Sequence, residues 1–347
     1  MEQLVRADAI LTENGFEYGK SIQIEDGVIK EVRDTGCFGT HREVIDFSGY
    51  TLSPCFCDYH LHFFEKKQES LNVISDTLIS YGITKVIEGG DSEFAGFNAK
   101  SLLKSRVDIV TAGFAVYKQG TYGQYIGRGV ANIREARELI AWLHAEGVSY
   151  IKIINSGIFR PGSGEITPGG FEKDELREIV TYAKERGLDV ECHANGEGAV
   201  GDAVEAGVSS VIHGMNVSEE TLSMMSDKDI KFIPTINAFL SLSGTTLDSV
   251  SGKNIEEAVD GHLSAVKSAL EKGVRVLPGS DSGASFIPYG SSYLAELLMF
   301  RKAGLSDKDI LLSAVKGRLR KGDKADFLVL KGLEPVKVFR SGLCISG

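Results

Sequence analysis

The chain of 347 residues lacks the features that mark membrane, secreted and nucleic-acid-binding proteins. No apolar run approaches the roughly 20 residues that span a bilayer, so we expect no membrane partner. The first residues show no basic segment followed by an apolar one, which predicts a cytoplasmic protein without a secretory signal. Lys and Arg total 38 against 48 Asp and Glu, a net charge of −10. Such a chain repels phosphate backbones, so we expect no nucleic-acid partner.

Cysteine pairs and nucleotide-binding loops are also missing. The five cysteines are an odd number and none lies in a C-x-x-C pair, which argues against a disulfide framework and a cysteine zinc knuckle. The glycines of 162–164 and 196–198 match neither a dinucleotide fingerprint nor a P-loop. What remains is a globular chain with 42% hydrophobic residues, for which a small molecule is the expected partner. Assembly into a homo-oligomer stays open.

Short apolar, β-branched runs alternate with helical periodicity from about Thr51 to Lys316. The helical pattern is clearest in Ile133–Glu146, Glu172–Arg186 and Ile255–Lys272, and a glycine follows each of them. Eight such alternations predict an α/β fold, a closed (β/α)8 TIM barrel. The expected strands are residues 53–60, 84–87, 107–116, 150–154, 189–193, 210–213, 231–235 and 274–277.

The two ends of the chain have a different pattern. Residues 1–50 and 318–347 contain strand-like runs separated by glycine, without a long helix. Neither end is long enough to bury a good core alone. We therefore predict that both termini build one small β-sandwich, beside a barrel domain of residues 51–317.

A histidine pair closes the first expected barrel strand, in the run CFCDYHLH. Alternation along a strand places Asp58, His60 and His62 on one face, and in a barrel the carboxyl ends of strands carry the active site. Two imidazoles on one face can chelate a divalent ion, although H-x-H alone is weak support for a metal site.

Three further candidate ligands follow later strands. His193 lies in VECHANG, His213 in SSVIHG and Asp281 in VLPGSDSG. Side chains at the ends of different strands converge on the barrel mouth. Imidazole and carboxylate together suit a cation such as zinc.

Lys152 interrupts the apolar strand YIKII. An ammonium group inside a barrel is costly, and three interpretations are open. The lysine can reach solvent from the strand end, or pair with an acid such as Asp281 at a lowered pKa. In the third interpretation, which we favour, a neutral amine adds carbon dioxide, and the resulting carbamate bridges two metal ions.

These residues together resemble the amidohydrolase superfamily. Its hallmarks are H-x-H, a lysine on the fourth strand, two later histidines and an aspartate on the eighth strand, and each position is occupied here. SPCFCDYHLH resembles the family's first-strand motif, GITKVIEGG its second strand and KGDKADFLVL its returning C-terminal strand. SYIKIINSG and AVEAGVSSVIHG are most similar to the imidazolonepropionase-related, prolidase-like (Xaa-dipeptidase) branch.

The resemblance implies a hydrolase with two divalent ions, expected to be zinc, and a Lys152 carbamate between them. His60, His62 and Asp281 would hold the more buried ion, and His193 and His213 the other. A bridging hydroxide would attack an amide-type carbonyl, and Asp281 would pass the proton to the leaving nitrogen. The expected substrate is a small molecule with a peptide, N-acyl amino acid or cyclic amide bond.

Two other functions stay open from the sequence. In a mononuclear aminohydrolase, which removes ammonia from a heterocycle, His213 would aid catalysis without binding metal. Lys152 favours the binuclear hydrolase, because such deaminases usually have no bridging lysine. A non-catalytic scaffold with the same fold is the third hypothesis, although the complete ligand set disfavours it.

Substrate contacts are expected from three loops, residues 117–128, 157–170 and 282–290, which contain aromatic and basic side chains. One hypothesis is that a cation of these loops binds a substrate carboxylate while tyrosines form the walls. Solvated loop charges are the competing interpretation. The candidate cations are Lys118, Arg128 and Arg160, and the candidate wall residues are Tyr117, Tyr122 and Tyr289.

Overall fold

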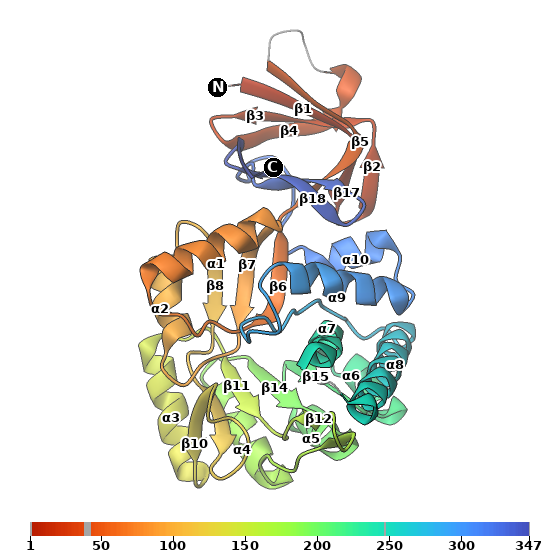
Figure 1. The fold of residues 1–347 in the computed structure, drawn as a ribbon. Coiled ribbons are helices and arrows are strands. Elements are labelled where there is room, and N and C mark those ends of the chain that lie inside the picture. Colours follow the sequence, from red (N-terminus) through yellow and green to blue (C-terminus); the bar gives the residue numbers. More distant parts are fainter. Residues whose placement is uncertain (1, 38–42, 246–247, 347) are drawn as a thin grey trace. The chain divides into compact units, whose positions relative to one another are not determined.

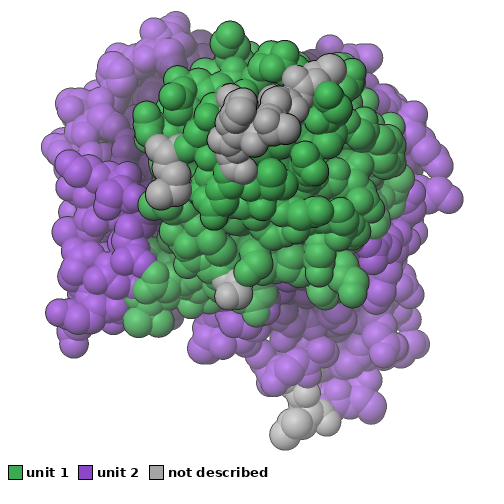
Figure 2. Space-filling view, turned by 90° about the horizontal axis from the view of Figure 1, so that it is seen from above, with its two compact units in different colours: residues 1–57, 73–85, 305–347 green, residues 58–72, 86–304 purple. Residues whose placement is uncertain are grey.

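The computed structural model describes residues 2–37, 43–245 and 248–346. Contacts within the chain divide it into two compact units, which Figure 2 shows in different colours. Unit 1 comprises residues 1–57, 73–85 and 305–347, and unit 2 comprises residues 58–72 and 86–304. The sequence predicts different limits, at residues 50 and 317, and these domain limits stay a prediction.

Unit 1 contains one eight-stranded sheet to which both ends of the chain contribute (Figure 1). The strand order is β19-β18-β17-β5-β1-β3-β4, and β2 pairs with β1. Ile29 N in β4, the last strand of this order, donates a hydrogen bond to Asp323 O (2.9 Å). This bond joins β4 to the segment that precedes β17. The strands are β1 (Glu2–Thr12), β2 (Gly15–Tyr18), β3 (Lys20–Glu25), β4 (Val28–Asp34), β5 (Glu43–Pro54), β17 (Phe327–Lys331), β18 (Glu334–Arg340) and β19 (Leu343–Ser346).

Apolar side chains from the two ends of the sequence share the core of this sheet. Ile10 and Leu52 pack in one buried cluster with Phe327 and Phe339. The rings of Phe327 and Phe339 are stacked with centroids 4.5 Å apart. Removing these surfaces from water stabilises the pairing of segments some 300 positions apart in the sequence, which neither end could supply by itself.

Unit 2 contains most of the barrel, whose strands are largely parallel, and strands β6 and β7 begin in unit 1. One sheet has the order β6-β7-β8, and a second has the order β10-β9-β11-β14-β15-β16. Isolated parallel bridges from Phe232 to Val276 and from Leu61 to Ser282 close the ring through residues 276–282. The strands are β6 (Phe56–Leu61), β7 (Ile83–Glu88), β8 (Asp108–Thr111), β9 (Ala115–Lys118), β10 (Gly127–Val130), β11 (Ile151–Ile154), β14 (Val190–Ala194), β15 (Ser210–His213) and β16 (Lys231–Ile233), with a hairpin of β12 (Phe159–Arg160) and β13 (Glu165–Ile166).

Three expected strands differ from the observed ones. Residues 53–60 are divided between β5 and β6, because Thr51–Pro54 pair with β17. Residues 107–116 form β8 and β9, which pair with different neighbours. Residues 274–277 contribute only the bridge at Val276, together with a bond from Leu277 N to Phe232 O, and form no regular strand.

Capping residues satisfy free backbone groups at the ends of several helices. Helix α3 starts at Asn132, whose side chain accepts from Glu135 N, and ends at the left-handed Gly147. In α4, Glu172 and Glu175 form a capping box. The helices are α1 (Gln68–Ser80), α2 (Ala95–Leu102), α3 (Ile133–Glu146), α4 (Lys173–Lys184), α5 (Glu197–Ala206), α6 (Glu219–Asp227), α7 (Ile236–Ser241), α8 (Ser249–Glu271), α9 (Ser291–Lys302) and α10 (Asp307–Ala314), with 3-10 turns at Thr35–Cys37 and Leu242–Thr245.

Within residues 2–37, 43–245 and 248–346, no helix combines the length and the apolar composition that crossing a membrane requires.

Candidate metal centre

Six predicted ligands line one cavity of about 190 Å³ in unit 2. They come from five different parts of the barrel, at the ends of β6, β14 and β15, within β11, and in the segment that closes the ring. Five of them are at most 7% exposed, and the side chain of Asp281 is 22% exposed. The six residues are His60, His62, Lys152, His193, His213 and Asp281.

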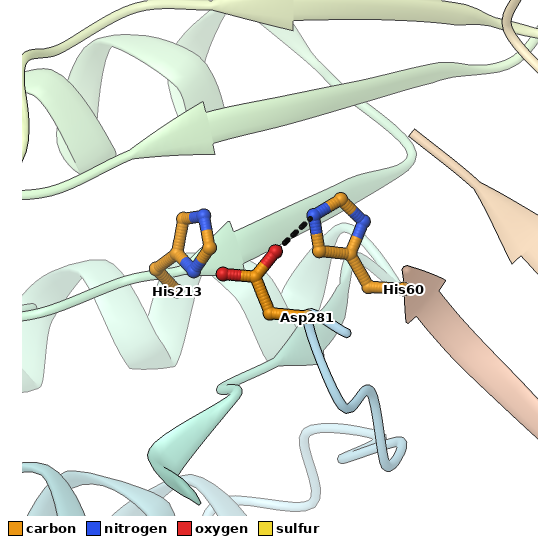
Figure 3. Close-up of side chains that lie close together, drawn as sticks. All are labelled: His60, His213 and Asp281. Carbon is orange, nitrogen blue, oxygen red and sulfur yellow. Dashed lines mark ion pairs between the residues drawn. The ribbon is translucent and has the colours of Figure 1, made fainter. Parts of the chain in front are cut away.

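The Asp281 carboxylate lies among the imidazoles. Asp281 Oδ1 is 3.3 Å from His60 Nε2 and 3.6 Å from His62 Nε2. One candidate ligand atom from each of His60, His213 and Asp281 lies within 4.8 Å of the other two. Figure 3 shows the carboxylate between the rings of His60 and His213. Three donors at such separations can surround a single divalent cation.

Three of the four imidazoles make a hydrogen bond through one ring nitrogen. His62 Nδ1 donates to Gly90 O (2.7 Å), and His193 Nε2 donates to Gly157 O (3.1 Å). His213 Nδ1 is bonded to Thr235 Oγ1 (2.7 Å). Because a carbonyl oxygen only accepts, the second nitrogen of His62 and of His193 keeps a lone pair. The second nitrogen of His213 keeps one when its Nδ1 is the donor to Thr235. A histidine ligand held by such an outer bond is oriented for a metal.

Burial keeps the four imidazoles neutral. Desolvation is the main cause that lowers their pKa, to about 4 for His193 and well below the usual value for His60 and His213. The pKa of His62 is also lowered by burial, while Asp281 opposes that shift. Neutral imidazole is the form that binds metal, so the site needs no deprotonation of its histidines near neutral pH.

Lys152 is fully buried within this set. Among the described residues its Nζ has no hydrogen-bond partner, and neither has Nδ1 of His60. Burial lowers the pKa of Lys152 to about 8, although Glu191 and Asp281 favour the charged form. Lys152 therefore does not reach solvent, and a buried amine without hydrogen-bond partners costs free energy.

Two of the six residues adopt a backbone conformation that side chains rarely tolerate. His213 has φ 68° and Asp281 has φ 55°, and Thr235, which holds His213, has φ 51°. Left-handed conformations at non-glycine residues cost free energy and cluster at functional sites. The close approach of β7 to the histidines needs glycine, because a Cβ at Gly89 would lie 2.6 Å from Cε1 of His60.

Two buried acids brace the centre. Asp58 accepts hydrogen bonds from Ser280 N (2.9 Å) and His60 N (3.2 Å), so it links β6 to the segment of Asp281. Glu88 accepts from Gly90 N (2.8 Å) and from Thr111 Oγ1 (2.5 Å). Burial raises the pKa of Asp58 to about 7 and that of Glu88 to about 8.

Sequence reasoning did not assign roles to Glu88, Thr235 or Ser280. The acid that ends the apolar strand ITKVIE was the available signal for Glu88. Thr235 and Ser280 carry no comparable signal, because short hydroxyl side chains are common in loops. Their bonds to His213 and Asp58 depend on which strands are neighbours in the barrel.

Of the three tyrosines expected to form walls, Tyr122 lines the cavity, with its ring 5.5 Å from that of His193. Tyr289 instead donates its hydroxyl to His62 O (2.7 Å) and thereby positions the backbone of a candidate ligand. Tyr117 packs beside Ala115 and Ile126 and is not part of the lining.

None of the three loop cations expected to meet a substrate carboxylate lines the cavity. Lys118 Nζ is bound to Glu175, at 2.5 and 2.7 Å from its two oxygens. The guanidinium of Arg128 lies 4.1 Å from the ring centroid of Phe114. Arg160 is exposed in the β12–β13 hairpin. The placement of these residues gives no support to the carboxylate hypothesis.

Known proteins share this fold. A crystal structure of a Xaa-Pro dipeptidase with bound methionine in the active site matches with a TM-score of 0.85 at 20% identity, over 100% of both chains. The crystal structure of ochratoxinase from Aspergillus niger matches with a TM-score of 0.78 at 18% identity, over 100% of this chain and 96% of that chain. The predicted α/β barrel with a small β domain from both termini is thereby confirmed.

Sequence comparison also finds ochratoxinase. Ochratoxinase of Aspergillus niger is 26% identical over 226 residues, which are 60% of this chain and 46% of the relative. This chain thus spans about half the length of that curated relative. The model of the amidohydrolase family matches residues 51–344, which include every candidate ligand. The chain therefore belongs to the amidohydrolase family.

Proposed function

We propose that this protein is a metal-dependent hydrolase that cleaves an amide-type C–N bond in a small molecule. The observation that carries the proposal is the convergence of four neutral imidazoles, the Asp281 carboxylate and the buried, unpartnered Lys152 on one cavity. Family membership supports it, as do relatives named as a dipeptidase and an ochratoxinase.

We propose that this donor set holds two divalent ions and that they are zinc. Imidazole nitrogen and carboxylate oxygen are ligands that zinc accepts, and three of the histidines are already oriented by bonds at their other nitrogen. His60, His62 and Asp281 would hold one ion, and His193 and His213 the other. Bound divalent ions polarise a carbonyl oxygen and lower the pKa of water, so that water becomes a nucleophile near neutral pH.

We propose a carbamate at Lys152. The Nζ is buried, faces no hydrogen-bond acceptor among the described residues, and shares the cavity with both groups of histidines. Bonding of Nζ to the carbon of carbon dioxide releases one proton and gives an anion with two oxygen donors. This change would remove the unpaired amine and would supply anionic oxygen donors to the metal ions.

Asp281 suits the proton transfer in this reaction. Hydrolysis adds the oxygen of water to the carbonyl carbon and breaks the C–N bond, so the leaving nitrogen needs a proton. Asp281 would take this proton from water on its carboxylate and deliver it to the nitrogen. Burial raises the pKa of this carboxyl, and its side chain is the most exposed of the six, so it can face a substrate.

Metal analysis and hydrolysis test the proposal together. Protein stripped with chelator and reloaded with zinc in bicarbonate buffer should bind two equivalents per chain and hydrolyse members of an amide panel. One equivalent with release of ammonia from a heterocycle would instead support the mononuclear aminohydrolase. Metal binding without turnover of any substrate class would support the scaffold. The cytoplasmic location and the oligomeric state stay predictions from the sequence.

A further inference from the structure

The walls of the cavity are apolar once the six candidate ligands are set aside. Asn195 and the hydroxyl of Tyr122 are the polar groups in the remaining lining, and Asn195 Oδ1 already accepts from Met215 N (3.1 Å). The apolar wall consists of Ile126, Ile158, Phe159, Ala238, Phe239, Leu242, Phe286 and Ile287.

The apolar wall begins directly beside the candidate ligands. The ring of Phe239 lies 6.0 Å from that of His213 and 6.4 Å from that of Phe159, both in edge-on contact. Phe286 and Ile287 follow Asp281 in the same loop. A group bonded to a carbonyl at the centre would therefore contact aromatic and branched side chains.

Large apolar side chains also remain exposed around this cavity. Ile158 is 41% exposed and Phe286 is 39% exposed, and both line it. Phe64, which is 43% exposed, stacks on His62 with ring centroids 5.7 Å apart. Apolar surface held open to water beside a pocket marks a place where an apolar ligand binds.

Lys152 is the one lysine or arginine in the lining that the described residues provide. The proposed function commits it to the metal centre. The remaining basic residues of the neighbouring loops are bound elsewhere or lie outside the cavity, as Lys118 and Arg128 show. The net charge of −10 adds a long-range repulsion of anions.

We infer that the substrate carries an uncharged, aromatic or branched apolar group next to the scissile amide, and not a carboxylate. This inference rests on the proposed function and narrows its substrate class. Binding would remove that group from water against the aromatic wall. A carboxylate in the same place would lose its hydration and find no cation or hydrogen-bond donor array in return.

A matched pair of anilides tests the substrate class. Acetanilide and 4-acetamidobenzoate share the amide and the ring and differ by one carboxylate. With the zinc-loaded protein we expect kcat/KM to be about 100-fold or more higher for acetanilide, the size expected when a charge is left unpaired in a pocket. Equal values, or a preference for 4-acetamidobenzoate, would overturn the inference.

A charge introduced in the wall provides a second test. Ile158→Arg places a cation in the lining at a position exposed enough to keep the fold. The variant should lower the ratio of kcat/KM for acetanilide to that for 4-acetamidobenzoate at least about tenfold. Leu298→Arg is the matched control, because Leu298 is 46% exposed in α9 and lies outside the lining. It should keep the full preference. An unchanged preference in Ile158→Arg would contradict the assignment of this wall.

Direct binding separates failure of this inference from failure of the proposed function. If neither anilide is hydrolysed, the amide panel decides whether the hydrolase proposal holds, and calorimetry with the same two compounds decides the ligand class. Tighter binding of acetanilide would support an apolar, uncharged ligand. Tighter binding of 4-acetamidobenzoate would refute it whether or not turnover is seen.

Discussion

Asp281 is joined to His60 by both its backbone and its side chain. Asp281 N donates to His60 O (2.7 Å), and Asp281 Oδ1 lies 3.3 Å from Nε2 of the same histidine. The backbone bond belongs to the contacts that close the barrel between β6 and residues 276–282. The contacts that close the barrel therefore also set the distance between two candidate ligands.

Zinc should stabilise the protein by binding its folded form. At a free concentration of 100 times Kd, linkage predicts about 2.7 kcal/mol of added stability. Thermal unfolding with zinc and with chelator measures the shift. His60→Ala should lose most of it, whereas His144→Ala, at an exposed position of α3, should keep it. Equal shifts in both variants would place the zinc elsewhere.

Lys152 should give a carbamate signal. After incubation with ¹³C-labelled bicarbonate and zinc, carbon NMR should show one carbamate resonance, which Lys152→Met abolishes. Lys302→Met, at an exposed position of α9, should retain it. A short carboxylic acid added to Lys152→Ala should restore part of the metal binding, because it fills the vacated space with an anion. A resonance that survives in Lys152→Met would rule out this site.

Gly96 should be needed for the metal centre although it is not part of it. A Cβ at Gly96 would overlap the Glu88 carboxyl group, which holds Gly90 and through it His62. We expect Gly96→Ala to lower the free energy of unfolding by about 1–3 kcal/mol and to weaken zinc binding about tenfold or more. Chemical denaturation and calorimetry measure the two effects.

Gly261→Ala is the matched control for that prediction. Gly261 is exposed within α8, and a Cβ there meets nothing within 4 Å. Alanine should stabilise the helix by about 0.5–1 kcal/mol and leave zinc binding unchanged. Unaltered zinc affinity in Gly96→Ala would show that Glu88 does not position His62.

The Lys118–Glu175 pair should stabilise the fold in a pH-dependent way. The bond to Lys118 lowers the pKa of Glu175 below its usual value of 4.5. The pair's contribution is thus present above pH 4.5 and disappears as the pH falls through the lowered pKa of the folded state. Lys118→Met should cost up to about 1 kcal/mol at neutral pH and nothing in acid, where Glu175 is protonated.

Denaturation at several pH values checks that profile. Lys253→Met, in an ion pair whose side chains are 75% and 65% exposed, should change stability little at any pH. The same Lys118→Met protein should keep its preference between charged and neutral substrates. If Lys118→Met lost activity only toward substrates with a carboxylate, the result would support the role in substrate binding that the sequence suggested for Lys118.

The candidate ligands could be found in the sequence because their placement follows from local rules. Side chains two apart on a strand share a face, which couples His60 and His62, and parallel strands end at one rim, which adds His193 and His213. Lys152 was recognisable because it interrupts an apolar strand. Helices such as α3 and α4 were recognisable from periodicity and their terminal residues.

Tertiary structure alone decided the partners of Lys118 and Arg128, which lie in β9 and β10. Nothing near Lys118 or Arg128 in the sequence indicates Glu175 or the ring of Phe114. The aromatic wall has the same origin, since Phe159 lies in β12, Phe239 in α7 and Phe286 in the loop after Asp281. Alternation and periodicity are set by backbone geometry within a few residues, whereas the neighbour of a loop side chain depends on how distant segments pack, and short-range patterns do not encode it.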